Sequence, residues 1–161
     1  DLKASYSGPF AVEEFYKTIE DWIKLKGYEK EPKKRSEHVT KDGKSINWFI
    51  EAHKPFDDLR SGIIVLHVMM NDVKNSTIKR NGKKISGSTG EVSVNINCFV
   101  QANIESSFYH VKPIYHLIRT LVAKYIYNFW EDKHEAMTTS DCHNLFKTIR
   151  AFFNMQRYKF E

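Results

Sequence analysis

Five polar residues in three extended segments have the side chains needed for acid–base chemistry. They are Glu51 and His53 in one segment, His67 in the next, and Asn95 and Asn97 in a third. A carboxylate and an imidazole can act as a general base, and amide N–H groups can stabilise an oxyanion. Glu51, His53 and His67 are therefore predicted to form a small-molecule or hydrolytic pocket if neighbouring strands present them on one face. The alternative is a polar network without catalysis.

Metal and cofactor motifs are missing from the sequence. His110 and His116 are six residues apart and Cys142 adjoins His143, which matches no standard zinc spacing. The sequence also has no phosphate loop, nucleophile elbow or nucleotide-binding glycine motif. We expect no metal and no cofactor, and a non-enzymatic function is favoured over catalysis.

Positive charge is concentrated in two polar segments, residues 30–35 and 74–84. With a net charge of +5 and a pI near 9.1, such segments attract a phosphate backbone, although solvated loops have the same composition. Nucleic-acid binding is therefore the second candidate function, with Phe49 or Phe99 stacking on a base. Its predicted contact residues are Lys33, Lys34, Arg35, Lys79, Arg80, Lys83 and Lys84.

The strongest pattern in the sequence is the alternation of apolar and polar residues from Glu91 to Ile104, which predicts a long, half-buried strand. Its polar side carries Ser, Asn, Gln and Phe but no charge, whereas charged residues normally protect exposed strands from association. We therefore predict an interface with a second copy of the chain or with another protein. The predicted interface residues are Asn95, Asn97, Phe99 and Gln101.

The N-terminal residues carry the signals of a helix. Pro9 is predicted at its first position, with Ser7 or Gly8 as the cap and Gly27 as the stop. Aromatic and aliphatic residues recur between them at helical spacing, so one face of this helix is expected to pack inward.

A hairpin is predicted next in the chain. Residues 28–35 have the composition of a connector, and a strand is expected at 36–40. The pair Asp42-Gly43 favours a tight turn into an alternating strand that begins near Ile46.

Residues 63–70 are apolar on both faces except at His67, which is typical of a central strand. The pair Asn81-Gly82 marks a second hairpin turn. Residues 86–90 are rich in Gly and Ser and are predicted to form a flexible turn before the long strand.

The last third of the chain is predicted to be helical. Residues 112–130 carry an apolar stripe at helical spacing, and Thr139 or Ser140 is expected to cap a separate final helix. Helices of this kind usually pack on their own sheet, so membrane binding is not expected.

These elements predict a single α+β domain over residues 1–161: an N-terminal helix, an antiparallel meander of four to five strands, and two C-terminal helices on one sheet face. An apolar fraction of 41% is enough for one sizeable core. The two cysteines are expected to be free thiols in a cytoplasmic protein, with a single disulfide as the alternative.

Overall fold

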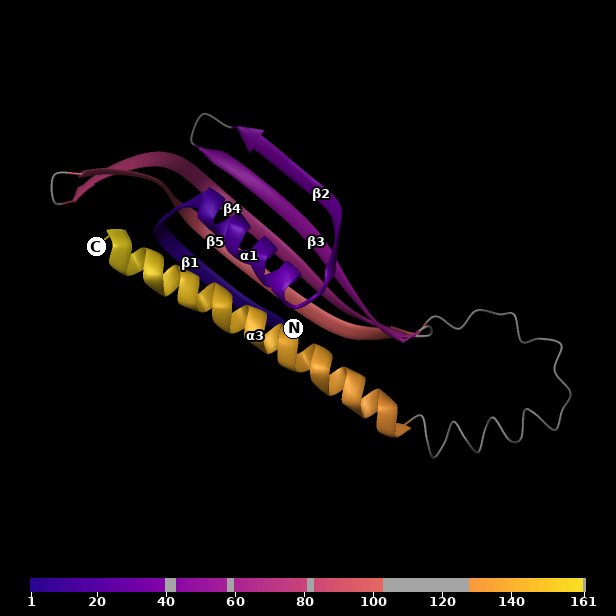
Figure 1. Ribbon diagram of the computed structural model, residues 1–161. Coiled ribbons are helices and arrows are strands. Elements are labelled where there is room, and N and C mark those ends of the chain that lie inside the picture. Colours follow the sequence, from indigo (N-terminus) through magenta and orange to yellow (C-terminus); the bar gives the residue numbers. More distant parts are fainter. Residues whose placement is uncertain (40–42, 58–59, 81–82, 103–127, 161) are drawn as a thin grey trace, which may run out of the picture.

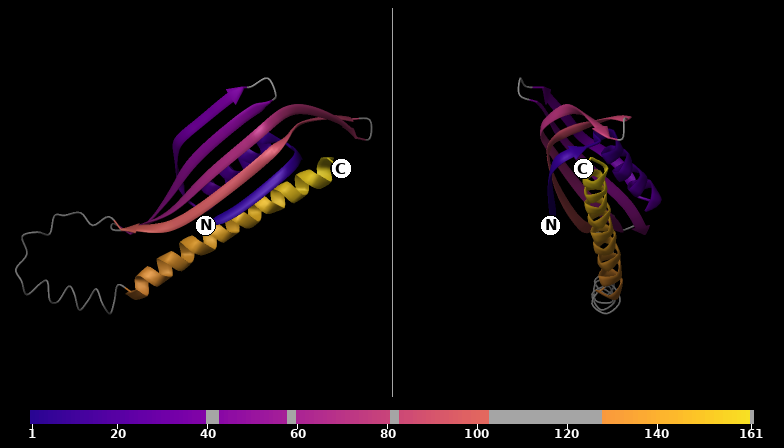
Figure 2. Two further views of the ribbon diagram at one scale, coloured as in Figure 1. Left: turned by 180° about the vertical axis from the view of Figure 1, so that it is seen from behind. Right: turned by 90° about the vertical axis from the view of Figure 1, so that its left-hand side faces the viewer.

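The computed structural model describes residues 1–39, 43–57, 60–80, 83–102 and 128–160 (Figure 1). Two helices cover one face of an antiparallel sheet whose strand order is β1-β5-β4-β3-β2 (Figures 1 and 2). The predicted α+β class with an antiparallel sheet is therefore confirmed; β2 to β5 follow one another as a meander, whereas β1 pairs with β5. The elements are β1 (Leu2–Phe10), α1 (Val12–Leu25), β2 (Glu29–Val39), β3 (Lys44–Asp57), β4 (Arg60–Arg80), β5 (Lys83–Ala102) and α3 (Asn128–Phe160).

Strand β1 replaces the predicted helix start. It pairs antiparallel with β5, from Leu2 opposite Ile96 to Phe10 opposite Ser88. Helix α1 begins only at Val12, so the prediction that Pro9 opens the helix was wrong. Pro9 is tolerated in β1 because an edge strand does not need every N–H for pairing. The predicted stop is confirmed, since Gly27 follows the helix with a φ of 70°.

Strand β2 begins earlier than predicted and includes most of the expected connector. Its register with β3 shifts between Pro32 and Lys34, and β2 is the other edge of the sheet, where a proline and a bulge are tolerated. The predicted hairpin is confirmed by the flanking pair, Val39 opposite Lys44.

Strand β4 is the central strand, as predicted, and it forms the second hairpin with β5, where Arg80 lies opposite Lys83. Residues 86–90 do not form the predicted flexible turn, because they lie inside β5. Their glycines permit close packing instead: a Cβ added at Gly87 would lie 2.6 Å from the Phe160 ring, and one at Gly90 would lie 2.8 Å from the carbonyl oxygen of Asn71.

Helix α3 is continuous from Asn128 to Phe160, so the prediction of a separate final helix capped by Thr139 or Ser140 was wrong. Both residues are exposed within the helix, and the neighbouring Thr138 bonds back to the carbonyl oxygen of His134 at 2.9 Å. The described residues thus contain one C-terminal helix, and the first helix predicted there lies mainly in 103–127, outside the described residues. Neither α1 nor α3 has a stretch long and apolar enough to cross a membrane.

The core lies between the helices and the inner face of the sheet. An aromatic cluster joins three elements: the Phe153 ring of α3 lies 4.7 Å from the Tyr6 ring of β1 and 5.3 Å from the Phe15 ring of α1. The other buried contributors from the helices are Tyr16, Ile19, Trp22, Ile23, Cys142, Leu145, Ile149 and Phe152.

Polar contacts fix the two helices relative to each other at both ends of α1. The Trp22 indole N–H donates to Asn144 at 2.8 Å. Near the other end, Gln156 and Lys159 donate to the Glu14 carboxylate at 2.8 and 2.7 Å. These hydrogen bonds, first that of Lys159, lower the pKa of Glu14.

Truncating Phe153, whose ring contacts both Tyr6 and Phe15, should destabilise the whole fold. Phe153→Ala is expected to lower the free energy of unfolding by about 3–5 kcal/mol, because a cavity would open where β1, α1 and α3 meet. Met155→Ala, on the same helix but 56% exposed, should change it by less than about 1 kcal/mol. Urea denaturation measures both, and equal losses would contradict this core.

The pH dependence of stability should include a contribution from Glu14. Because its pKa is lowered in the folded state, its stabilisation is complete above the unfolded-state pKa and is lost as the pH falls through the folded value. Between about pH 5 and pH 3, wild type should therefore lose more Tm than Glu14→Gln. Glu13→Gln removes the same charge at the neighbouring position and should retain the wild-type dependence.

Candidate functional site

The face of the sheet opposite the helices, called here the outer face, contains the predicted interface. Asn95, Asn97, Phe99 and Gln101 lie in a row along β5, at every second position of the strand. Asn97, Gln101 and Phe99 are exposed, the last by 49%. The structure therefore places these four side chains on one surface.

Apolar residues of the central strand β4 lie beside this row. Val65 is opposite Asn97, and Met69, which is 38% exposed, is opposite Ser93. Ile63 is buried between Phe99 and His53, its partners on the two adjacent strands. The outer face thus has an apolar strip bordered by amides and hydroxyls.

The predicted pocket residues share this face but do not converge. Nε2 of His53 lies 3.0 Å from a carboxylate oxygen of Glu51. His67 instead contacts the side-chain oxygen of Asn47 through Nε2, at 2.7 Å. Because His53 is opposite Ile63, four residues from His67, the two imidazoles are roughly 13 Å apart along the sheet. The two groups cannot act on one substrate atom in this arrangement.

The two basic segments are also far apart. Lys34 is opposite Phe49 and therefore level with His67, whereas Lys79 is twelve residues farther along β4, roughly 40 Å along the strand. Arg35 is engaged within the chain: it donates to Glu37 at 2.7 Å and lies 4.7 Å from the centre of the Tyr16 ring. Only the backbone positions of Lys33, Lys34, Lys79, Arg80, Lys83 and Lys84 are described.

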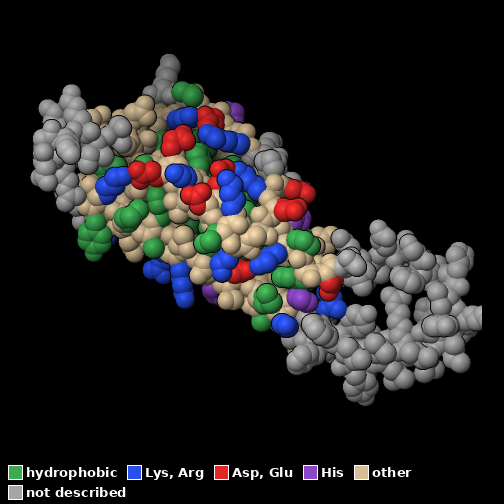
Figure 3. Space-filling model, viewed as in Figure 1, with side chains coloured by type: hydrophobic (Ala, Val, Ile, Leu, Met, Phe, Trp, Pro, Cys, Tyr) green, Lys and Arg blue, Asp and Glu red, His purple; other side chains and the backbone are tan. Residues whose placement is uncertain are grey.

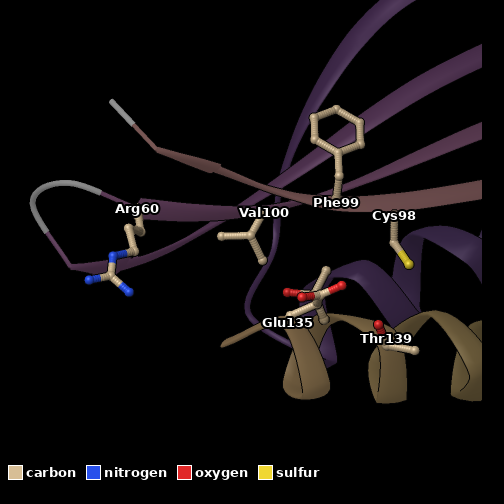
Figure 4. Close-up of a pocket in the computed structure, with 7 residues that line it drawn as sticks. Arg60, Cys98, Phe99, Val100, Glu135 and Thr139 are labelled. Carbon is tan, nitrogen blue, oxygen red and sulfur yellow. The ribbon is translucent and has the colours of Figure 1, made fainter. Parts of the chain in front are cut away.

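A cavity of about 320 Å³ lies between the ends of β4 and β5 and the first turns of α3 (Figure 4). Cys98 and Val100 point into it from the inner face of β5, whereas the Phe99 ring points to the other side of the sheet (Figure 4). Its lining residues are Arg60, Cys98, Phe99, Val100, Glu135, Thr138 and Thr139.

The sequence did not reveal this cavity, because the predicted central strand began only at residue 63, after Arg60 and Gly62. Arg60 is in fact buried in β4, with Nε 3.9 Å from the carboxylate of Asp57. Gly62 allows α3 to approach, since a Cβ there would lie 2.7 Å from the hydroxyl of Thr138. A glycine inside an apolar strand was the available signal of such an approach.

Two thiols lie beside the cavity. Cys98 packs against the core that contains Cys142, although the two residues belong to β5 and α3. Burial, followed by the contact with Cys98, raises the pKa of the Cys142 thiol to about 12. Both cysteines are free, so the expectation of free thiols agrees with the structure, but their proximity was not predicted.

Charged residues are arranged differently on the helix side of the molecule and on the outer face. On the helix side, lysines and arginines are interspersed with acidic residues (Figure 3), and Lys26 and Asp141 form an ion pair of 2.9 Å. By contrast, β5 carries no charged residue from Val92 to Gln101. In the part of the chain that the structure describes, no three metal-binding side chains cluster.

Comparisons with known proteins do not identify a family for this chain. No family model matches it, and neither a curated protein nor a solved structure does. The site must therefore be interpreted from its own geometry.

A substitution at Gly62 can test whether α3 lies against β4 beside the cavity. Gly62→Ala should lower the free energy of unfolding by about 1–3 kcal/mol, because the added methyl group would collide with Thr138 and with the Phe56 ring. Ser61→Ala, on the neighbouring position of β4, should have a smaller effect. Thermal denaturation compares the two, and a neutral Gly62→Ala would show that α3 does not lie against β4 at this point.

Proposed function

We propose that the chain is a non-enzymatic assembly module, located in the cytoplasm, whose outer sheet face binds a second copy of itself. The observation that supports this proposal is the exposed, uncharged row of Asn97, Phe99 and Gln101 beside the exposed Met69. A monomer gains nothing from leaving Phe99 in water, whereas a partner would bury it.

The contact must use the face of β5 rather than its edge. Both edges of β5 are already occupied, by β1 and by β4. Among the described strands, the sheet edges are β1 and β2, and each contains a proline that discourages strand addition. Face-to-face packing is the remaining way for β5 to meet a partner.

The chemistry of the row favours a second copy over an unlike partner. In a two-fold interface the same surface meets itself, so like charges would repel. Asn97 and Gln101 carry both donors and acceptors in their amides, and Ser93 does so in its hydroxyl. Such residues can form hydrogen bonds with their own copies, and Phe99 and Met69 can pack on theirs.

The face is large enough for a specific interface. With strands about 4.8 Å apart and residues about 3.3 Å apart, ten residues from each of five strands cover about 800 Å². A standard interface buries about 800 Å² on each partner. The outer face therefore matches the required area only if most of it takes part.

Light scattering coupled to size exclusion tests the proposal. Wild type should be a dimer at about 50 µM, and Phe99→Lys or Asn97→Lys should produce monomers, because each would place a buried charge opposite its own copy. Met155→Lys adds the same charge to an exposed position on α3 and should remain dimeric.

A wild-type monomer, unchanged by either outer-face substitution, would contradict the proposal. If that monomer also retained nucleic acid at low salt, the function would belong to the basic segments instead.

A further inference from the structure

The contact between Cys98 and Cys142 joins two elements that are far apart in the sequence. Cys98 lies on the inner face of β5, and its sulfur points toward α3 (Figure 4). Cys142 lies on α3 among core residues. Cys98 lines the cavity together with Thr138 and Thr139 of α3, and Cys142 lies one helical turn beyond Thr138 in the core against which Cys98 packs. The two thiols are therefore neighbours at the contact between β5 and α3.

The two thiols differ in access. Cys98 is half-buried and lines the cavity of about 320 Å³, so a small reagent can reach it. Cys142 is 2% exposed, so a reagent in solution meets Cys98 first. This is the arrangement of an attacking thiol and a resolving thiol in redox-active pairs.

We propose that Cys98 and Cys142 form an oxidisable dithiol, a modification site at which a low-molecular-weight disulfide such as oxidised glutathione converts them to an intramolecular disulfide. This inference is independent of the proposed dimer, because Cys98 faces the helices and the neighbouring Phe99 faces the opposite side of the sheet.

The reaction takes place in two exchanges. The Cys98 thiolate attacks one sulfur of the reagent, a mixed disulfide forms, and the first glutathione thiolate leaves. The Cys142 thiolate then attacks the Cys98 sulfur and releases the second. The two protein thiols lose two electrons and two protons, and the reagent gains them as two molecules of reduced glutathione.

The disulfide would attach α3 covalently to β5 and close a loop that contains residues 103–127. Closing a loop of this length restricts the unfolded chain, so we expect the Tm to rise by about 5–10 °C. The second exchange should be slow at neutral pH and faster with rising pH, because the raised pKa of Cys142 keeps its thiol protonated.

Equilibration of the full-length chain with reduced or oxidised glutathione tests the site. Mass spectrometry should find a Cys98–Cys142 crosslinked peptide and no retained glutathione, thiol titration should fall from two to zero, and the Tm should rise as stated. Cys98→Ser and Cys142→Ala should each form no crosslink. Cys142→Ala should instead retain one glutathione on Cys98.

Three results would overturn the inference. They are two unreacted thiols in the folded wild type, a stable glutathione adduct on wild-type Cys98, and disulfides that link separate chains. The dimer can fail its own test without affecting any of these readouts, because the oxidation is measured within one chain.

Discussion

The double pairing of β5 is the constraint on which the rest of the structure depends. β1 holds one edge from Leu2 to Phe10 and β4 holds the other along nearly its whole length, so β5 has no free edge in the described fold. Its inner residues, among them Val92, Val94 and Ile96, are committed to the helices. Within the described residues, its outer face alone is left to meet a partner, which makes the composition of that face the main clue to function.

Sequence reasoning located most elements because their signals were local. The alternation in β5 and the turn pairs Asp42-Gly43 and Asn81-Gly82 depend on neighbouring residues, and they gave the meander in the correct order. Strand β1 was missed because Pro9 in a polar segment imitates a helix start, whereas its true conformation depends on pairing with β5, about ninety residues away. Gly87 and Gly90 were misinterpreted for the same reason, since Gly87 is required by the approach of α3 and Gly90 by the approach of β4.

The candidate sites, too, could be predicted only where their signals were local in the sequence. A period of two was enough to place Asn97, Phe99 and Gln101 on one face, but only the register shows that His53 and His67 are far apart. The cavity and the cysteine pair require knowledge of how α3 lies against β5, which no local pattern contains. We thus propose separate roles for the two faces of one strand: association for the outer face, and oxidation at Cys98 for the inner face.

The most direct measurement of the central claim is the rate of methionine oxidation by peroxide, compared between residues as the protein concentration is raised. Met69 lies on the outer face and Met155 on the exposed side of α3, so each chain contains its own control. If the outer face binds a second copy, oxidation of Met69 should slow several-fold by about 100 µM protein while that of Met155 stays constant. Oxidation of Met69 at a rate independent of concentration, in parallel with Met155, would contradict the account.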